Sequence, residues 1–296
     1  MPCRRNSRAS WPPSSRRPSL PDAEAEDSAY LSPPVQRAAR LLRHIAEGDT
    51  VTNMAATARA LGINRTTLLR LLTTLEAERF IEPIGPNAGW RIGLGLIGMA
   101  AQAFFSQDLV QTAVPCIARL ADTTDLSAHL GVLDGVDIVY VLRRTPEHGR
   151  YVSNIRVGSR LPAHAAVMGR IILAHMPPDT VQRLFAGAPL QATTPHTPVT
   201  MEQLAERLAA DRAAGLAWSD GFFEAGISSV AAAIFDASGA PIAAINVSGQ
   251  TASFDGPARR ERIGRAVAET AEEISRRLGW AGPARHQNPP RLEVVA

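Results

Sequence analysis

Residues 61–72 read LGINRTTLLRLL, and this stretch decides the fold of the first third of the chain. Gly62 ends one apolar helical stripe, and Asn64 is a residue type that caps the N-terminus of the next helix. After it, leucines recur at helical spacing and are expected to face a core: Leu68, Leu71, Leu72 and Leu75. Two helices joined by a glycine-bearing turn form the helix-turn-helix pattern.

The sequence on either side extends this pattern into a domain. An apolar stripe from Val35 to Ile45 predicts an earlier helix that stops at Gly48. After the third helix, two short strand-like runs at 80–84 and 90–92 flank a turn rich in Gly, Pro and Asn, which is a hairpin signal. Three helices followed by a hairpin predict a winged helix-turn-helix domain over residues 34–93.

With its leucines turned inward, the third helix presents polar residues outward near its N-terminus. Arg pairs with guanine edges or phosphates, and Thr contacts thymine methyl groups or phosphates. A solvated helix face is the alternative, but three helices and a wing in this order favour DNA. The residues expected to read the major groove are Arg65, Thr66, Thr67 and Arg70. The candidate phosphate contacts, which position the protein without reading sequence, are Arg37 and Arg91.

The charge distribution places any nucleic-acid site in the first third of the chain. All 31 basic residues are Arg, and the net charge is +3. Residues 34–93 carry a net +3, whereas residues 94–280 carry −2. The complete absence of Lys is better explained by a GC-rich coding sequence than by function.

Composition excludes several classes of protein. With 45% hydrophobic and 20% charged residues, the 296-residue chain is typical of a globular protein with room for two domains. The longest uncharged apolar stretch, 92–107, is too short for a membrane span, and the Arg-rich first twenty residues lack the apolar core of a signal peptide. We therefore expect a cytoplasmic protein without membrane contact. Two cysteines and scattered histidines predict no metal site.

Residues 93–98, GLGLIG, match the dinucleotide-binding fingerprint by letter only. That fingerprint needs a buried strand before it and an acidic residue about 20 positions later at the end of a second strand, and neither is present. The motifs G-x-S-x-G, Walker A and H-E-x-x-H do not occur either. We therefore predict that the protein is not an enzyme and carries no cofactor.

The rest of the chain alternates helices with hairpins. A helix over 94–105 is expected to lie in a linker, 94–107, and another helix follows over 108–123. Strands at 127–133 and 136–142 flank Asp134-Gly135, and strands at 229–235 and 242–248 form a second hairpin. Further helices are predicted at 164–175, 201–214 and 258–278. This pattern predicts an α+β domain with an antiparallel sheet over 108–280, between a disordered Arg/Pro/Ser-rich leader, 1–33, and a disordered tail, 281–296.

These motifs together resemble the IclR family of bacterial transcriptional regulators over nearly all of 34–280. The resemblance is carried by residues 61–75, by the aromatic and Leu-Gly pattern of 90–95, by RVGSRLPAHA at 156–165 with Gly169, and by GISSVA at 226–231. Residues 132–144, VLDGVDIVYVLRR, are similar to regulators of aromatic-acid catabolism of the protocatechuate and hydroxybenzoate type.

The resemblance implies a winged helix-turn-helix domain, a linker helix and a GAF-like effector domain in a homodimer or a dimer of dimers. It also implies effector contacts at Val167, Met168, Asp220, Ile227, Ser229, Asn246 and Ser248. Independently, Asn246 and Ser248 stand two apart on a strand and so share one face. A satisfied polar patch on that face is the alternative. His164 either binds an anionic ligand or, as we favour, bonds to backbone and organises its loop.

The sequence is therefore interpreted as a DNA-binding transcriptional regulator, a repressor rather than an activator of a catabolic operon, whose operator affinity responds to a small organic or aromatic acid. Two rivals stay open at this point. One is a small-molecule-processing enzyme with a helix-turn-helix module, for which Asp220, His164 and Ser229 would have to supply the chemistry. The other is a GAF-like sensor that acts through protein contacts.

Overall fold

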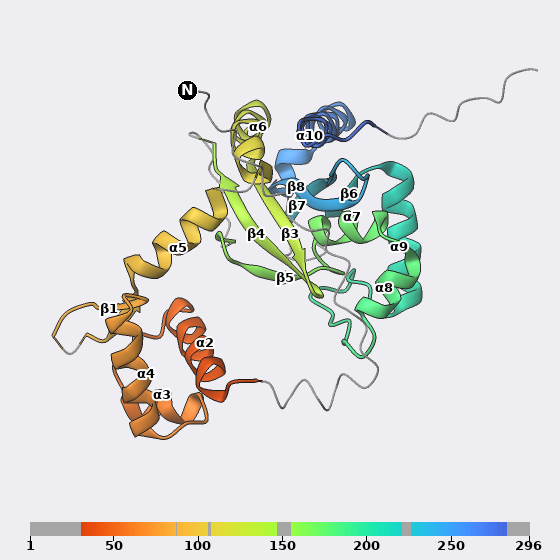
Figure 1. Ribbon diagram of the computed structural model, residues 1–296. Coiled ribbons are helices and arrows are strands. Elements are labelled where there is room, and N and C mark those ends of the chain that lie inside the picture. Colours follow the sequence, from red (N-terminus) through yellow and green to blue (C-terminus); the bar gives the residue numbers. More distant parts are fainter. Residues whose placement is uncertain (1–30, 87, 106–107, 147–154, 221–225, 283–296) are drawn as a thin grey trace, which may run out of the picture. The chain divides into compact units, whose positions relative to one another are not determined.

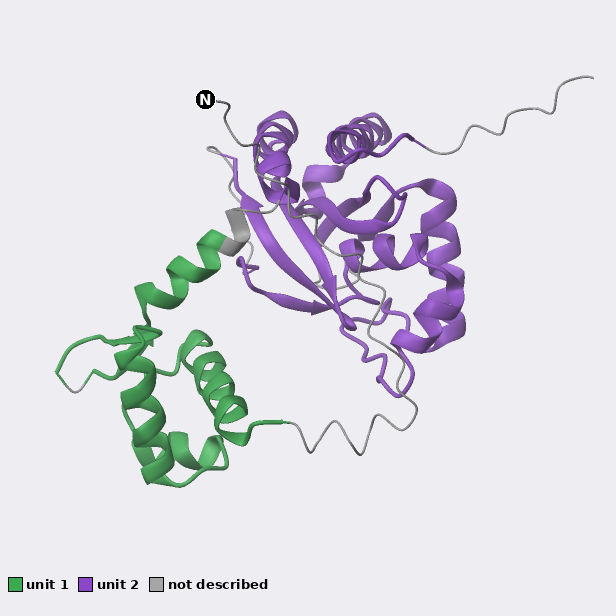
Figure 2. Ribbon diagram, in the orientation of Figure 1, with its two compact units in different colours: residues 1–102 green, residues 103–296 purple. Residues whose placement is uncertain are grey.

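The structure is a computed structural model that describes residues 31–86, 88–105, 108–146, 155–220 and 226–282 (Figure 1). Nearly all of the predicted leader and tail lie outside these residues. The chain divides into two compact units, residues 1–102 and 103–296 (Figure 2). The division falls inside helix α5 (Leu94–Phe105), in the segment predicted to link the two domains.

The first unit confirms the predicted winged helix-turn-helix. Its elements are α2 (Pro33–Ala46), α3 (Met54–Ala60), α4 (Arg65–Ala77), β1 (Ile81–Pro83) and β2 (Trp90–Ile92), the two strands pairing antiparallel. Asn64 caps α4 by accepting a hydrogen bond from the Thr67 N–H at 2.7 Å. Buried apolar side chains from all three helices and the wing, including Leu41, Leu68 and Ile81, form one core.

The first two glycines of the GLGLIG stretch, Gly93 and Gly95, are explained by close packing. A Cβ atom on Gly93 or Gly95 would lie 2.5 or 2.6 Å from the carbonyl oxygen of Arg79, just beyond the end of α4. The Gly95 N–H also donates a hydrogen bond to that oxygen at 3.0 Å. Only residues without a side chain let the start of α5 approach this backbone.

The second unit is built on a six-stranded antiparallel sheet in the order β5-β4-β3-β8-β7-β6. The strands are β3 (Ser127–Asp134), β4 (Asp137–Arg144), β5 (Arg160–Pro162), β6 (Ala217–Asp220), β7 (Ile227–Phe235) and β8 (Pro241–Gln250). The two predicted hairpins, β3–β4 and β7–β8, pair with each other through β3 and β8. Short strands β5 and β6 form the two edges.

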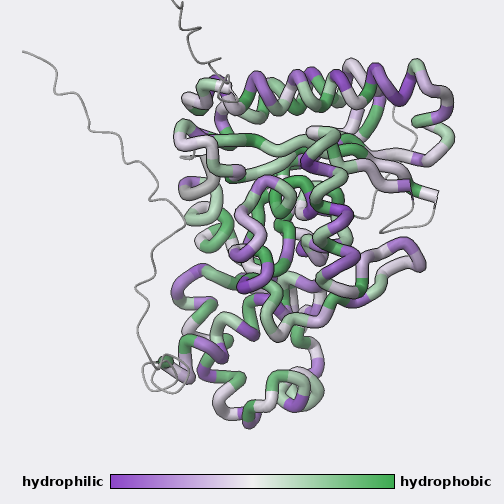
Figure 3. Tube along the Cα trace, turned by 90° about the vertical axis from the view of Figure 1, so that its right-hand side faces the viewer, coloured by the Kyte–Doolittle hydropathy of each residue, from purple (hydrophilic) through white to green (hydrophobic). Residues whose placement is uncertain are grey.

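Helices cover both faces of this sheet. Helices α6 (Asp108–Thr124) and α10 (Pro257–Arg277) lie side by side on one face (Figure 1). Helix α7 (Val167–His175) packs on the other face, with α9 (Met201–Ala214) against it and α8 (Pro178–Leu184) following α7 in the chain. Figure 3 shows largely hydrophobic strands flanked by helices in which hydrophobic and hydrophilic residues alternate. This arrangement confirms the predicted α+β fold.

Alternation along β8 separates the two sides of the sheet. Ala243, Ile245 and Val247 belong to the apolar core under α6 and α10, whereas Ala244 belongs to the core under α7. Because successive side chains on a strand point to opposite faces, Asn246 and Ser248 lie on the α7 side. We call this surface the α7 face.

The packing of α5 on Arg79 predicts that Gly95→Ala destabilises the first unit by about 1–3 kcal/mol, because the added methyl group meets backbone that cannot move aside. Thermal unfolding measures the change. Gly98→Ala in the same helix is the matched control, since its Cβ meets nothing within 4 Å and alanine favours a helix. Equal melting temperatures for the two variants would contradict the packing account.

Candidate functional site

Helix α4 presents an open face near its N-terminus. Arg65, Thr66 and Arg70 are exposed, as the helical spacing predicts, whereas Thr67 is half-buried. Leu69, which was not among the predicted contacts, is 55% exposed and stands one helical turn after Arg65, on the same stripe of α4. An apolar side chain at this place suits a thymine methyl group. The face therefore offers guanidinium, hydroxyl and apolar contacts together.

The wing is tied to α4 by polar contacts. The Trp90 Nε1–H donates to Glu76 Oε2 of α4 at 3.1 Å. Arg91 is exposed on β2, and its guanidinium forms an ion pair with Glu82 across the wing, with Nη2 and Oε1 2.7 Å apart. Arg37 is half-buried on α2. Of the two candidate phosphate contacts, Arg91 therefore lies on the surface and already holds one carboxylate.

The α7 face brings together most of the predicted effector contacts. Ser229 on β7 is the register partner of Ser248 on β8, and Asn246 stands two residues away on the same face. Ile227 begins β7 on this side of the sheet. The first turn of α7 supplies Val167 and Met168, which pack into the core of this face.

Met168 reaches the strands because β3 carries a glycine beneath it. A Cβ on Gly131 would lie 2.8 Å from Met168 Cε and 2.9 Å from an Ile138 side-chain carbon. The N-cap of α7 is Ala166, which has no side-chain oxygen to bond the first N–H groups of the helix. The N-terminus of α7, which carries partial positive charge, therefore has no side-chain cap. This helix packs on the α7 face, where the polar residues lie.

A buried histidine on this face was missed by the sequence reasoning. His129 on β3 is 0% exposed, and its Nδ1 lies 2.9 Å from Asn246 Oδ1. Burial lowers the pKa of His129 to about 4, so its ring is neutral. Two buried side-chain atoms here have no hydrogen-bond partner, His129 Nε2 and Ser248 Oγ. The sequence does hold a signal for His129. It stands two residues after Ser127 on a predicted strand, so the two polar side chains share one face of that strand.

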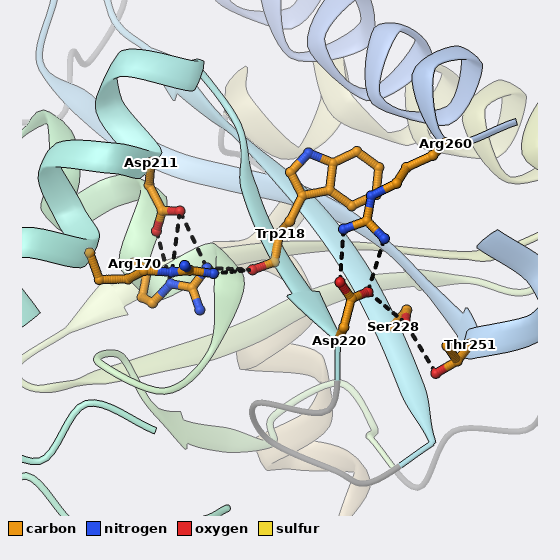
Figure 4. A network of polar contacts seen from close by, with 8 residues as sticks. Arg170, Asp211, Trp218, Asp220, Ser228, Thr251 and Arg260 are labelled. Atoms are coloured by element: carbon orange, nitrogen blue, oxygen red, sulfur yellow. Dashed lines mark hydrogen bonds and ion pairs between the residues drawn. The ribbon is translucent and has the colours of Figure 1, made fainter. Parts of the chain in front are cut away.

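Asp220 is not brought to the α7 face, unlike the other predicted effector contacts. Its carboxylate points to the α10 side, where Arg260 donates to Oδ1 at 3.1 Å and to Oδ2 at 2.8 Å (Figure 4). Ser228 also donates to Oδ1 at 3.0 Å. The Arg260 guanidinium holds the pKa of Asp220 below its usual range.

Strand periodicity explains the misplacement of Asp220. On β6, Ala217 packs under α7 and Trp218 under α10, so Ser219 shares the α7 face and Asp220 faces the other way. Ser219 is also the register partner of Ser229. A shift of one residue moves a side chain to the opposite face of a sheet, and Ser219 holds the place that Asp220 was expected to fill.

The three residues on which an enzymatic reading depended are kept apart. Asp220 lies on the far face from Ser229, and His164 Nε2 bonds to the Gln191 carbonyl oxygen at 3.1 Å. This is the bond to backbone that we favoured for His164, and its role in organising the loop stays a prediction. Helix α7 begins at Val167, not at His164 as expected, so His164 lies in the segment before it. No nucleophile and base meet among these three residues.

Arg170 anchors α7 to its neighbours. It is fully buried, with Nε 2.9 Å from Asp211 Oδ2 on α9 and Nη2 donating to the Trp218 carbonyl oxygen at 2.6 Å (Figure 4). Burial raises the pKa of Asp211. The pair fixes α7 against α9 and β6, and with it the first turn of α7.

The described parts of the chain contain neither a candidate metal cluster nor a candidate membrane-spanning helix. No cluster of three or more His, Cys, Asp or Glu side chains there could hold a metal ion. No helix within the same residues is long and apolar enough to cross a membrane. Phe222 and Phe223, which the sequence suggests as an apolar rim of the effector site, lie outside the described residues.

The Arg170 network predicts that Asp211→Asn lowers the free energy of unfolding by about 3–5 kcal/mol, because a buried guanidinium is left without its counter-charge. Urea unfolding measures the loss. Glu261→Gln, which removes an exposed ion pair with Arg265, is the control and is expected to cost less than about 0.5 kcal/mol. A loss in Asp211→Asn no greater than in this control would show that the network does not anchor α7.

Family models match both units. The IclR helix-turn-helix domain matches residues 34–85, and the bacterial transcriptional regulator IclR C-terminal domain matches residues 101–276. Among curated proteins, the HTH-type transcriptional regulator BhcR of Paracoccus denitrificans is 31% identical over 85% of this chain and 88% of its own length. The transcriptional repressor IclR of Escherichia coli is 27% identical over 89% of this chain and 95% of its own length.

Solved structures agree. An IclR transcriptional regulator from Alicyclobacillus acidocaldarius has a TM-score of 0.74 and 28% identity, covering 84% of this chain and 100% of its own. An IclR homologue from Microbacterium hydrocarbonoxydans, complexed with 4-hydroxybenzoate, shares the fold with a TM-score of 0.72 at 24% identity, covering 83% of this chain and 98% of its own. Since a family model matches more than half of its length, the chain belongs to the IclR family of bacterial transcriptional regulators.

Proposed function

We propose that this regulator binds operator DNA through α4 and the wing, and that a small organic acid bound on the α7 face changes its affinity for that DNA. The observation that carries the proposal is the buried polar group on the α7 face, where His129 Nε2 and Ser248 Oγ have no partner. Buried polar atoms are nearly always hydrogen-bonded, so two unpartnered atoms on one face suit a ligand.

The DNA contacts follow from the exposed face of α4. Arg65, Thr66, Thr67 and Arg70 would reach base edges in the major groove, and Arg37 and Arg91 would contact phosphates. A homodimer, or a dimer of dimers, would present two such helices to half-sites about 34–36 Å apart or a multiple of that spacing. We favour repression over activation and expect the protein in the cytoplasm, where bacterial operator DNA lies.

The expected effector is an acid because of the charge at the end of α7. The N–H groups of a first helical turn carry partial positive charge, and Ala166 provides no side-chain oxygen to compensate it. Val167, Met168, Ile227, Ser229, Asn246 and Ser248 would surround the ligand, with Ser219 in place of Asp220. The 4-hydroxybenzoate bound by the related structure shows that an aromatic acid of this size is a reasonable probe.

The effector acts through linkage. An acid that binds one state of the protein more tightly than another shifts the population toward that state by its differential affinity and by no more. Helix α5 joins the units and begins at Leu94, and the glycines on either side of that residue, Gly93 and Gly95, pack on the backbone of Arg79 just beyond the end of α4. A change in α5 would therefore act directly on the recognition helix.

Replacing Arg70 with Ala is expected to weaken operator binding at least tenfold and to reduce the dependence of binding on salt, because a DNA-facing guanidinium releases counterions. Fluorescence anisotropy over a series of salt concentrations measures both quantities. Arg265→Ala on α10, exposed and outside the first unit, is the matched control. Operator affinity that is unchanged by Arg70→Ala would overturn the role of α4.

A thermal-shift screen with organic acids tests the effector site. An acid at 100 times its dissociation constant stabilises the protein by about 2.7 kcal/mol. Ser248→Ala should abolish most of that stabilisation, because its hydroxyl faces the site, whereas Asp220→Asn should leave it unchanged. An equal loss in both variants would show that the ligand does not bind on the α7 face.

A further inference from the structure

His129 uses only one of its two ring nitrogens. Nδ1 faces Asn246 Oδ1 at 2.9 Å, while Nε2 is buried without a partner. The buried His164 makes the opposite use of its ring, since its Nε2 bonds to the Gln191 carbonyl oxygen. A core histidine with a purely structural role would be expected to have its buried polar atoms satisfied in this way.

The contact with Asn246 assigns the hydrogen of the neutral ring to one nitrogen. An amide oxygen can only accept a hydrogen bond, so with Asn246 Oδ1 facing it Nδ1 of His129 is the donor. In a neutral imidazole the other nitrogen is then an acceptor. Burial and the nearby charge of Arg143, its register partner on β4, lower the pKa of His129 to about 4 and keep the ring neutral at physiological pH.

The ring is also held in place. Tyr140, buried on β4, meets it edge to face with ring centroids 5.4 Å apart. A hydrogen bond on one side and an aromatic contact on the other orient the imidazole. Nε2 is therefore a preorganised acceptor rather than the end of a mobile side chain.

We propose that His129 is a specificity-determining residue of the effector site, selecting a hydroxylated organic acid whose O–H donates to Nε2 while its carboxylate accepts from Ser248 Oγ. This inference rests on the proposed function of the α7 face. Without a hydroxyl, an acid of the same skeleton leaves Nε2 unbonded. A methyl ether of the same acid has an oxygen that can only accept, so it cannot donate a hydrogen bond to Nε2.

The strand register makes it feasible for one small molecule to span both groups. Ser127 pairs with Ser248 and His129 pairs with Asn246, so His129 and Ser248 are diagonal neighbours on β3 and β8. Diagonal neighbours on paired strands are separated by about 7–8 Å. A short hydroxy acid or a ring-bearing hydroxy acid fits this span, whereas a long acyl chain is not required.

The first test needs no ligand. In 15N-labelled full-length protein, histidine NMR correlations identify the protonated nitrogen of His129, with Asn246→Ala used to assign its signals. The proposal expects hydrogen on Nδ1 and a bare Nε2. Hydrogen on Nε2 would overturn it, because that nitrogen could not then accept from a hydroxyl group.

The second test compares matched acids by calorimetry on the full chain: 4-hydroxybenzoate, benzoate and 4-methoxybenzoate, and lactate against propionate. At least one hydroxy acid is expected to bind about ten- to a hundredfold more tightly than its partner without the hydroxyl. His129→Leu should remove that ratio, His129→Gln should restore part of it through its amide oxygen, and Ser248→Ala should weaken both members of the pair alike.

The outcomes separate the two proposals. Binding that depends on Ser248 but shows no preference for the hydroxy acid, or a preference that survives His129→Leu, would overturn the inference and leave the effector site standing. No binding of any of these acids would count against both. Operator affinity without ligand checks that each variant is folded.

Discussion

The alternation of side chains along β8 and β3 is the constraint on which the second unit depends. One face of these strands, with Ala128, Leu130, Ile245 and Val247, is fully buried in an apolar core under α6 and α10. The opposite face carries His129 and Asn246 in a hydrogen-bonded pair. A single sheet thus provides both the stability of the unit and a polar surface. The free-energy cost of burying these polar side chains is offset by the apolar side chains buried on the other face.

Helix α7, which packs on the polar face, is held by buried contacts and has no side-chain cap at its N-terminus. Arg170 holds α7 through Asp211 and the Trp218 carbonyl group, and a Cβ on Gly169 would lie 2.3 Å from the Ala163 carbonyl oxygen. These contacts leave α7 little freedom to move independently. A ligand at its first turn would therefore contact a helix that is tied to α9 and β6.

Local patterns predicted the fold well. Asn64 caps α4 and Thr200 caps α9, accepting from the Gln203 N–H at 3.2 Å, because these signals act within one helical turn. The two hairpins followed from their turns and from period-two alternation. The edge strands β5 and β6 are three and four residues long and are held by pairing with distant segments, so little in their own sequence indicates them.

The site was predicted less completely, for reasons of register and distance. Asn246, Ser248 and Ser229 were placed correctly on one face because they share a strand or a hairpin. Asp220 was expected at the site because of the family resemblance, but the register of β6, which no local signal fixes, turns it to the opposite face of the sheet. His129 and Asn246 are 117 residues apart, so their contact is visible only once β3 and β8 pair. Leu69 was named neither among the predicted core leucines nor among the predicted DNA contacts.

A crystal structure of the full-length protein grown with the most strongly stabilising acid would show whether a small acid binds on the α7 face. We expect ligand density in contact with His129 and Ser248, under the first turn of α7. Density confined to another place, such as the Asp220 and Arg260 pair on the opposite face, would contradict it.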